Sequence, residues 1–290
     1  MKEIVVVSGK GGTGKTSVTA SLAFLSSEAI TLADCDVDAA NLHLLFGIEY
    51  DEGEEFYSGQ LAEIDQNECL NCGRCKTVCH FGAITETDGQ HVIDQIDCEG
   101  CGYCARICPQ AAINMKDNMA GKIYDSTTRF NTSMVHARLG IVAENSGKLV
   151  ARVKEKAREV ATRNNSDYVL VDGSPGIGCP VVSSLSGADY VLIITEPTVS
   201  GIHDLERVYE VVKQFDLETG VVINKNDLNI SKSNEIKAYL QKNNVELLAK
   251  LPWHREFSES LAQGKIVGEK KNSMLKPIFI ELWKKFKELI

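Results

Sequence analysis

The stretch SGKGGTGKTS, residues 8–17, constrains the fold of this chain more than any other feature. It follows EIVVV (residues 3–7), a short run of β-branched residues that is typical of a fully buried strand. The residues after Gly14 are small or apolar and include no proline or glycine, which favours a helix. A glycine-rich loop between a strand and a helix is the setting of a phosphate-binding loop, because its backbone N–H groups and the helix N-terminus face the phosphates.

This loop carries the complete pattern G-x-x-x-x-G-K-S/T. We expect Lys15 to neutralise the β- and γ-phosphates and Thr16 to bind Mg²⁺ through its hydroxyl. The residues of the loop predicted to bind the nucleotide are Gly9, Lys10, Gly11, Gly12, Thr13, Gly14, Lys15, Thr16 and Ser17.

Eight of the ten cysteines form two compact runs with the spacing C-x₂-C-x₂-C-x₃-C. This doubled run is the pattern of bacterial two-cluster ferredoxins, in which the fourth cysteine of each run binds the other cluster. We therefore predict two 4Fe-4S clusters, the first on Cys69, Cys72, Cys75 and Cys108 and the second on Cys98, Cys101, Cys104 and Cys79. Zinc is the alternative, but zinc ribbons use two C-x-x-C pairs separated by a longer loop. His80 replaces the usual proline, either as a surface substitution or as a hydrogen-bond donor to the cluster.

Outside the cysteine-rich segment, strands and helices alternate, which predicts an α/β fold with a doubly wound, mostly parallel sheet. Residues 1–56 and 117–290 would form this P-loop ATPase domain, and residues 57–116 an inserted α+β ferredoxin-like domain. The predicted strands are Glu3–Ser8, Ala29–Asp34, Met134–Leu139, Tyr168–Asp172, Tyr190–Thr195, Gly220–Asn224 and Leu247–Leu251.

Acidic residues stand at the ends of two predicted strands, where open α/β sheets bind their ligands. Asp36 follows the second strand and Asp172 ends the fourth, and both are candidate catalytic residues. We interpret Asp34 and Asp38, on either side of Asp36, as solvated carboxylates.

The additional lysine in KGGTGKT, Lys10, resembles the deviant phosphate-binding loop of the MinD/ParA/Mrp and nitrogenase iron protein superfamily. The resemblance implies an ATP-bound homodimer in which Lys10 reaches the partner's phosphates. It also implies that Asp36, aligned on Asn41-Leu42, positions the attacking water. In DGSPGIG, Asp172 would hold the water shell of Mg²⁺ and Gly176 would sense the γ-phosphate.

The identity of the base stays open between ATP and GTP. In the superfamily, an Asn such as Asn224 reads adenine together with a proline-containing loop, here at Pro252. The segment Asn224-Lys225-Asn226-Asp227, however, spells the guanine-reading signature N-K-x-D. We favour ATP.

The remaining cysteines and the C-terminal segment are weaker candidates. Cys35 and Cys179 are expected to be small buried residues. A bridging cluster like that of the nitrogenase iron protein would need a second cysteine, and Asn145 takes its approximate place. The apolar stripe of MLKPIFIELWKKFKELI, residues 274–290, resembles the membrane-binding helix of MinD, but core-packing helices carry the same stripe more often.

The bulk properties exclude several functions. A net charge of −9 argues against a general nucleic-acid binder. The N-terminus has no signal-peptide pattern and no stretch is long enough to span a membrane, so we expect a cytoplasmic protein.

Three functions follow, in order of preference. The first is an ATPase that couples nucleotide hydrolysis to electron transfer through the two clusters, with a redox partner. The second is an ATPase that assembles or carries metal cofactors for another protein. The third is a MinD-like positioning or scaffold ATPase.

Overall fold

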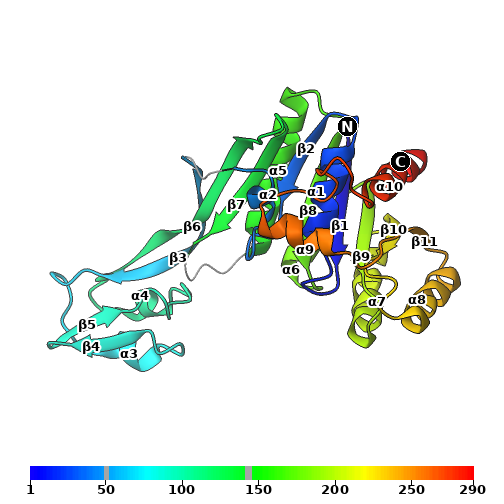
Figure 1. Ribbon diagram of the computed structural model, residues 1–290. Helices are drawn as coiled ribbons and strands as arrows, with labels where there is room; N and C mark the ends of the chain where they lie inside the picture. Colours follow the sequence, from blue (N-terminus) through cyan, green and yellow to red (C-terminus); the bar gives the residue numbers. More distant parts are fainter. Residues whose placement is uncertain (49–51, 141–145) are drawn as a thin grey trace. The chain divides into compact units, whose positions relative to one another are not determined.

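A nine-stranded sheet, with strand order β11-β10-β9-β1-β8-β2-β7-β6-β3, forms the centre of the fold (Figure 1). The computed structural model describes residues 1–48, 52–140 and 146–290. The strands of this sheet are β1 (Lys2–Ser8), β2 (Ile30–Asp34), β3 (Glu54–Ile64), β6 (Ile113–Thr127), β7 (Ser133–Leu139), β8 (Tyr168–Pro175), β9 (Tyr190–Thr195), β10 (Glu218–Ile223) and β11 (Glu246–Lys250).

The seven strands that the sequence predicts are all present, and their neighbours pair in parallel from β11 to β7. The α/β fold and its mostly parallel sheet are therefore confirmed. Strand β1 lies between β8 and β9 although both come much later in the chain. This central position brings the phosphate-binding loop next to the carboxyl ends of β8 and β2, where Asp172 and Asp34 stand.

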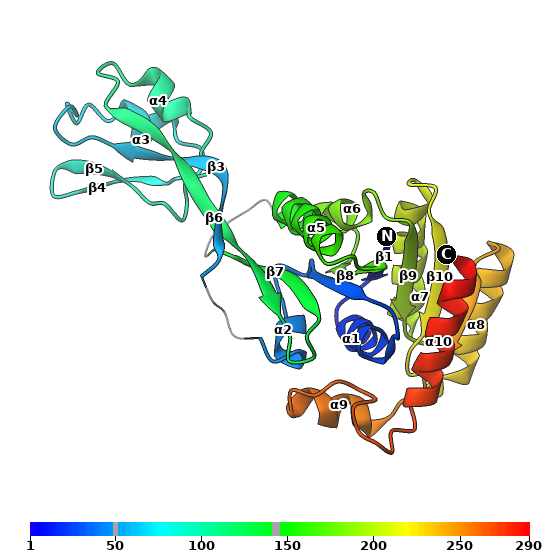
Figure 2. The same ribbon diagram turned by 90° about the horizontal axis from the view of Figure 1, so that it is seen from above.

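Helices cover both faces of the sheet. Figure 2 shows α5 and α6 on one face and α1 and α10 on the other. The helices of this part of the chain are α1 (Lys15–Leu25), α2 (Leu42–Leu45), α5 (Ser146–Arg163), α6 (Cys179–Leu185), α7 (Val199–Lys213), α8 (Ile230–Lys242), α9 (Arg255–Ala262) and α10 (Lys276–Leu289).

The C-terminal helix α10 buries its apolar stripe in the core. Phe279, Leu282, Trp283 and Phe286 are all buried and belong to the same cluster as the apolar residues of β1 and α1. The stripe that resembled a membrane-binding helix is therefore covered by the protein's own sheet. Among the described residues, no helix is both long and apolar enough to cross a membrane.

The chain forms two compact units. The first contains residues 1–54, 123–139 and 146–290, and the second contains residues 55–122 together with Gly140. Strands β3 and β6 pass from one unit into the other. The sequence did not predict these two long strands, because polar and apolar residues do not alternate strictly along most of their length. The predicted division at residues 57 and 116 stays a prediction.

The second unit is built as two similar halves. It adds α3 (Arg74–Val78), β4 (Ile84–Thr87), β5 (Gln90–Ile93) and α4 (Tyr103–Ile107) to its parts of β3 and β6. Helices α3 and α4 have equal lengths and begin at Gly73 and Gly102, both in the left-handed conformation with φ 72°. Each helix ends at a cysteine, Cys79 or Cys108, in extended conformation. The internal duplication of the sequence is thus present in the backbone.

Candidate functional site

The loop between β1 and α1 has the conformation that a phosphate-binding loop requires. Gly14, the N-cap of α1, has φ 93°, which residues other than glycine rarely adopt. A Cβ on Gly14 would also lie 2.4 Å from Nδ2 of Asn224. That amide donates a hydrogen bond to the carbonyl of Thr13 at 2.7 Å. The residue after β10 is therefore joined directly to the loop.

A cleft of about 1650 Å³, including the solvent at its mouth, opens over this loop. Many of the predicted nucleotide-binding residues line it together: Gly11, Gly12, Thr13, Gly14, Lys15, Thr16, Ser17, Asp36 and Asn224. Five of the other predicted site residues are not part of this lining: Gly9, Lys10, Asp172, Gly176 and Pro252. The phosphate-binding part of the prediction is therefore brought together in one place, and the base-reading part only through Asn224.

Aromatic residues that the sequence did not single out form part of the cleft wall. Trp253 and Phe257 line it, and 49% of Trp253 is exposed. Ligand pockets combine such apolar walls with a few polar groups that fix orientation. The position of Trp253 directly after Pro252 is the only signal in the sequence that could have suggested it.

Lys15 lies at the centre of a buried group of charges. Its Nζ is 2.7 Å from Oδ1 of Asp172 and 3.4 Å from Oδ2 of Asp36. Burial disfavours the charged lysine, but the two carboxylates outweigh it and the pKa of Lys15 is raised. Thr19 donates a further hydrogen bond to Oδ1 of Asp172 at 3.2 Å. Lys15 is therefore held charged at the floor of the cleft, as phosphate binding requires.

One carboxylate oxygen in this group has no protein partner. Oδ2 of Asp172 is buried and accepts no hydrogen bond from any residue that the structure describes. A buried, unsatisfied carboxylate oxygen costs free energy unless a ligand satisfies it. Magnesium prefers carboxylates, hydroxyls and waters, and Asp172, Asp36 and Thr16 supply suitable donors. The residues present thus fit the Mg²⁺ ion that the sequence predicts.

Asp34 is not the solvated carboxylate that we expected. It is completely buried, and it accepts hydrogen bonds from the backbone N–H groups of Asp36 and Leu42, each at 3.1 Å. Burial, together with the charge of Asp172, raises the pKa of Asp34 to about 7. Asp34 therefore shapes the turn that carries Asp36. Asp38, by contrast, is exposed as expected.

Asp36 keeps the position expected of a residue that acts on the bound nucleotide. It is partly exposed and lines the cleft beside Lys15. Burial raises the pKa of Asp36, the attraction of Lys15 lowers it, and the net direction is upward. A carboxylate with a raised pKa accepts a proton from water more readily than an ordinary one.

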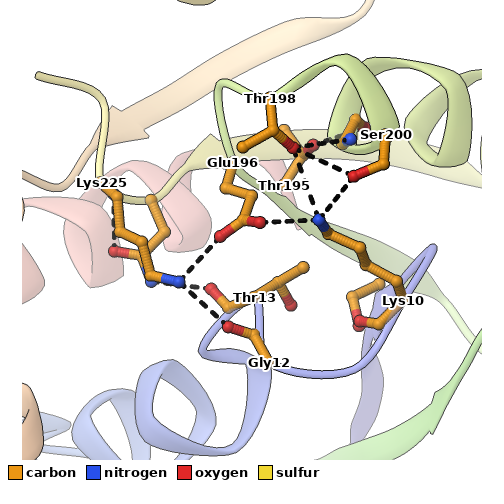
Figure 3. A network of polar contacts seen from close by, with 11 residues as sticks. Lys10, Gly12, Thr13, Thr195, Glu196, Thr198, Ser200 and Lys225 are labelled. Carbon is orange, nitrogen blue, oxygen red and sulfur yellow. Dashed lines mark hydrogen bonds and ion pairs between the residues drawn. The ribbon is translucent and has the colours of Figure 1, made fainter. Parts of the chain in front are cut away.

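Lys10 is paired with a carboxylate of its own chain. Its Nζ lies 2.7 Å from Oε1 of Glu196, and it also donates to Ser200 at 2.8 Å. The other oxygen of Glu196 is 2.7 Å from Nζ of Lys225, which also donates to the carbonyl of Gly12 at 3.1 Å. Figure 3 shows Glu196 between the two lysines, beside the loop. Burial raises the pKa of Glu196, but the lysines outweigh it and the net shift is downward. Glu196 is not among the site residues that the sequence predicts.

The N-K-x-D segment makes contacts within the chain. Oδ1 of Asn224 accepts from the backbone N–H of Lys225, and its Nδ2 is bonded to Thr13. Oδ1 of Asp227 accepts from the backbone N–H of Trp253 at 2.6 Å. Asn224 thus lines the cleft while its amide already has two backbone partners. The roles of Asn224 and Pro252 in reading the base stay predictions.

The eight clustered cysteines lie around two small cavities in the second unit, each of about 370 Å³. One cavity is lined by Cys69, Cys72, Cys75 and Cys108, and the other by Cys98, Cys101, Cys104 and Cys79. These are the two ligand sets that the sequence predicts, including the exchange of the fourth cysteine. Within the described residues, no three His, Cys, Asp or Glu side chains are close enough together to hold a single metal ion. A four-iron cluster binds each thiolate at a different iron, so its ligands stand farther apart than those of one ion.

One expectation about the remaining residues, the burial of Cys179, is wrong. Cys35 is completely buried as expected, but Cys179 is exposed at the start of α6. The apolar residues of α6 that face the core are Val181 and Leu185, and Cys179 lies before them. Asn145 lies outside the described residues. His80 is exposed and lines neither cavity, which agrees with a surface substitution.

Comparisons with known proteins agree with this site. A model of the CobQ/CobB/MinD/ParA nucleotide-binding domain matches residues 4–267. The chain belongs to this family. It is 36% identical to an uncharacterized protein of Methanocaldococcus jannaschii over 229 residues, which is 78% of this chain and 79% of that protein.

Solved structures of septum-determining proteins share the fold. MinD of Pyrococcus horikoshii, complexed with Mg-ADP, is 21% identical with a TM-score of 0.59, and the match covers 99% of this chain and 96% of that one. MinD in a complex with MinC from Aquifex aeolicus is 17% identical with a TM-score of 0.58, again over 99% and 96%. These two structures show the fold alone. The family match supports a nucleotide-binding ATPase of the MinD/ParA kind more directly than electron transfer, which we had placed first.

Proposed function

We propose that this chain is a Mg²⁺-dependent ATPase that works as a MinD-like nucleotide switch. The observation that supports this most is the charged group under the phosphate-binding loop. Lys15 is buried and held by Asp172, and one oxygen of Asp172 has no partner among the described residues. Lys15 also lines a cleft large enough for a nucleotide. Membership of the family supports the same activity.

Different residues of the site have different roles in the proposed hydrolysis. The loop amides and Lys15 bind the phosphates, and Thr16 and Asp172 hold the Mg²⁺ ion and its waters. Magnesium would neutralise charge on the phosphate oxygens. Asp36 stands 3.4 Å from Nζ of Lys15 at the open side of the site, where it can orient a water for attack. Gly176 donates its backbone N–H to the carbonyl of Ser8, so it lies against the end of β1 within reach of the same loop.

An ATP-dependent homodimer is part of the proposal. Lys10 is bound to Glu196 of its own chain, and it would have to leave this partner to reach the phosphates of a second protomer. The switch would then have two states, one with Lys10 on Glu196 and one with Lys10 on nucleotide. Gel filtration with ADP and with a non-hydrolysable ATP analogue should show a monomer and a dimer, respectively.

Two neighbouring hydroxyls provide a matched test of the nucleotide site. Thr16 and Ser17 both line the cleft, but only Thr16 is predicted to bind Mg²⁺. Thr16→Ala should weaken ADP binding about tenfold when Mg²⁺ is present, in keeping with the ~1.5–3 kcal/mol of a hydrogen bond to a charged group, and should leave binding in EDTA unchanged. Ser17→Ala should weaken binding equally in both conditions. Calorimetric titration measures both, and equal effects of Mg²⁺ on the two variants would contradict the assignment.

A second candidate function, electron transfer, is favoured by the two cysteine-lined cavities. Their lining fits two 4Fe-4S clusters, held by the two sets of four cysteines named above. Such clusters would supply one-electron transfer. Soft thiolates bind iron–sulfur clusters, zinc and copper(I), and the doubled spacing of the cysteines favours iron–sulfur clusters among these. The ATPase would then link its nucleotide cycle to a redox partner or to a protein that receives a metal cofactor.

The anaerobically purified chain tests this second candidate. Iron and acid-labile sulfide should approach eight of each per chain, and a Cys72→Ser, Cys101→Ser double variant should lose most of both. Chelatable zinc in place of iron would contradict the proposal. Transfer of iron and sulfide to an apo-ferredoxin on ATP hydrolysis would favour the carrier function over electron transfer.

A further inference from the structure

His91 is a buried histidine at the wall of one cysteine-lined cavity, and its Nδ1 has no hydrogen-bond partner among the described residues. It lies on β5, in the hairpin that β4 and β5 form, and only 5% of it is exposed. It lines the cavity of Cys69, Cys72, Cys75 and Cys108. Its Nδ1 is completely buried, and no described residue forms a hydrogen bond with it. A buried polar group of this kind costs free energy unless a ligand satisfies it.

The backbone around His91 holds the ring in place. Its N–H donates to Oδ1 of Asn71 at 3.3 Å, and its carbonyl accepts from Nε2 of Gln66 at 2.9 Å. The ring lies over Gly73, where a Cβ would be 3.6 Å from Nε2. Asn71 in turn donates its backbone N–H to Sγ of Cys69 at 3.4 Å. The imidazole is therefore fixed to the loop that carries the cysteines.

The internal duplication shows that His91 is specific to one cavity. Matching positions in the two halves are Cys69 and Cys98, Gly73 and Gly102, Ile64 and Ile93, and Ala62 and His91. Each cavity is lined by residues of both halves, and Ile64 of the first cavity matches Ile93 of the second. At another matching pair of positions, His91 lines the first cavity and Ala62 lines the second. No described histidine lines the second cavity.

We propose that His91 is a positioning residue that donates a hydrogen bond to a sulfur of the cluster bound by Cys69, Cys72, Cys75 and Cys108. The inference rests on the proposed clusters. Four cysteines already complete that ligand set, so the imidazole serves as a donor and not as a fifth ligand. A donor stabilises the reduced cluster, which carries one more negative charge, and so raises its reduction potential. His91 therefore makes this cluster a better electron acceptor than it would be without the donor.

The test is an anaerobic EPR-monitored redox titration of the full chain and its variants. His91→Leu removes the donor and should lower one of the two reduction potentials, leaving the other unchanged. A tenfold change in the equilibrium constant, about 59 mV for a one-electron couple, is expected. His91→Gln keeps an N–H donor and should recover most of the shift. Arg74→Gln removes an exposed cation from the same cavity lining and should change the potential much less.

Two outcomes separate this inference from the proposal on which it rests. If iron and sulfide are both present in His91→Leu and neither potential moves relative to the unchanged chain, the role of His91 is wrong while the clusters stand. If the unchanged chain holds no iron and sulfide after anaerobic reconstitution, the clusters themselves are wrong. Ala62→His adds an independent measurement, because it should raise the potential that His91→Leu leaves unchanged.

Discussion

Glu196 is a carboxylate whose removal should strengthen the binding of ATP. It bridges Lys10, at the start of the phosphate-binding loop, and Lys225, which also donates to the carbonyl of Gly12 (Figure 3). In the proposed dimer, the phosphates of the ATP bound to the second protomer would compete with Glu196 for Lys10. We predict that Glu196→Gln binds a non-hydrolysable ATP analogue with Mg²⁺ more tightly than the unchanged chain, because the glutamine amide competes less strongly for Lys10.

The size of the effect follows from the burial of the three side chains. Glu196 is 12% exposed, whereas Lys10 and Lys225 are 29% and 31% exposed. Exposed ion pairs contribute about 0–1 kcal/mol, and hydrogen bonds to charged groups in buried sites about 1.5–3 kcal/mol. A half-buried contact should therefore contribute about 1 kcal/mol. If nucleotide binding breaks one such contact, its removal should tighten binding roughly fivefold, and the loss of the bridge should lower the free energy of unfolding by about 1 kcal/mol.

Isothermal titration with the ATP analogue and Mg²⁺ measures the affinity, and urea unfolding without nucleotide measures the stability. Glu206→Gln is the matched control, because it removes the same charge from an exposed position on α7. Both titrations should be run at two ionic strengths, since salt screens a general charge effect more than it weakens a direct contact. Glu196→Gln with unchanged or weaker affinity, or with the same gain as Glu206→Gln, would refute competition between Glu196 and the phosphates.

Three further predictions concern the same site. Gly14→Ala should lower the free energy of unfolding by at least about 2 kcal/mol, because φ of Gly14 is 93° and the new Cβ would meet Asn224. Gly11→Ala is the control, because no atom lies within 4 Å of its Cβ, and it should change the free energy of unfolding little. Urea unfolding measures both. Lys15→Met should destabilise the nucleotide-free protein by about 3–5 kcal/mol, because it leaves the buried Asp172 uncompensated; an unchanged melting temperature would contradict this. With a pKa raised from 3.8 to about 7, Asp34 binds a proton more tightly in the folded chain, so its contribution to stability falls by up to ~4 kcal/mol as the pH rises from 4 to 7. Over that range, the free energy of unfolding of the unchanged chain should fall relative to that of Asp34→Asn. A difference between the two chains that does not change with pH would contradict the assignment.

The fold and the phosphate site could be predicted because their signals are local. A buried strand, a glycine-rich loop and a helix follow each other within 25 residues, and each is recognisable by itself. The two cysteine runs are equally local, and their spacing alone predicted which four residues surround each cavity. In both cases the residues that act together are near in sequence or are related by a repeat.

The residues that the sequence missed are those whose surroundings come from distant segments. Glu196 is an ordinary acidic residue until β9 brings it between Lys10 and Lys225. Asp34 resembles the solvated Asp38 in sequence, and only the packing of β2 between β7 and β8 buries it. A carboxylate that we expected to be solvated is therefore buried and accepts two backbone hydrogen bonds.

His91 is another residue that the sequence did not predict for a site. The sequence singled out His80, because it stands next to a cysteine and replaces an expected proline. In the structure His80 is exposed and lines neither cavity. His91 stands seven residues before the nearest cysteine in the chain, and it reaches its cavity only because the hairpin of β4 and β5 places it over Gly73. Adjacency in sequence is therefore a poor guide to which side chain contacts a bound group. The duplicated backbone is a better guide, because the matching positions show that His91 of the first cavity corresponds to Ala62 of the second.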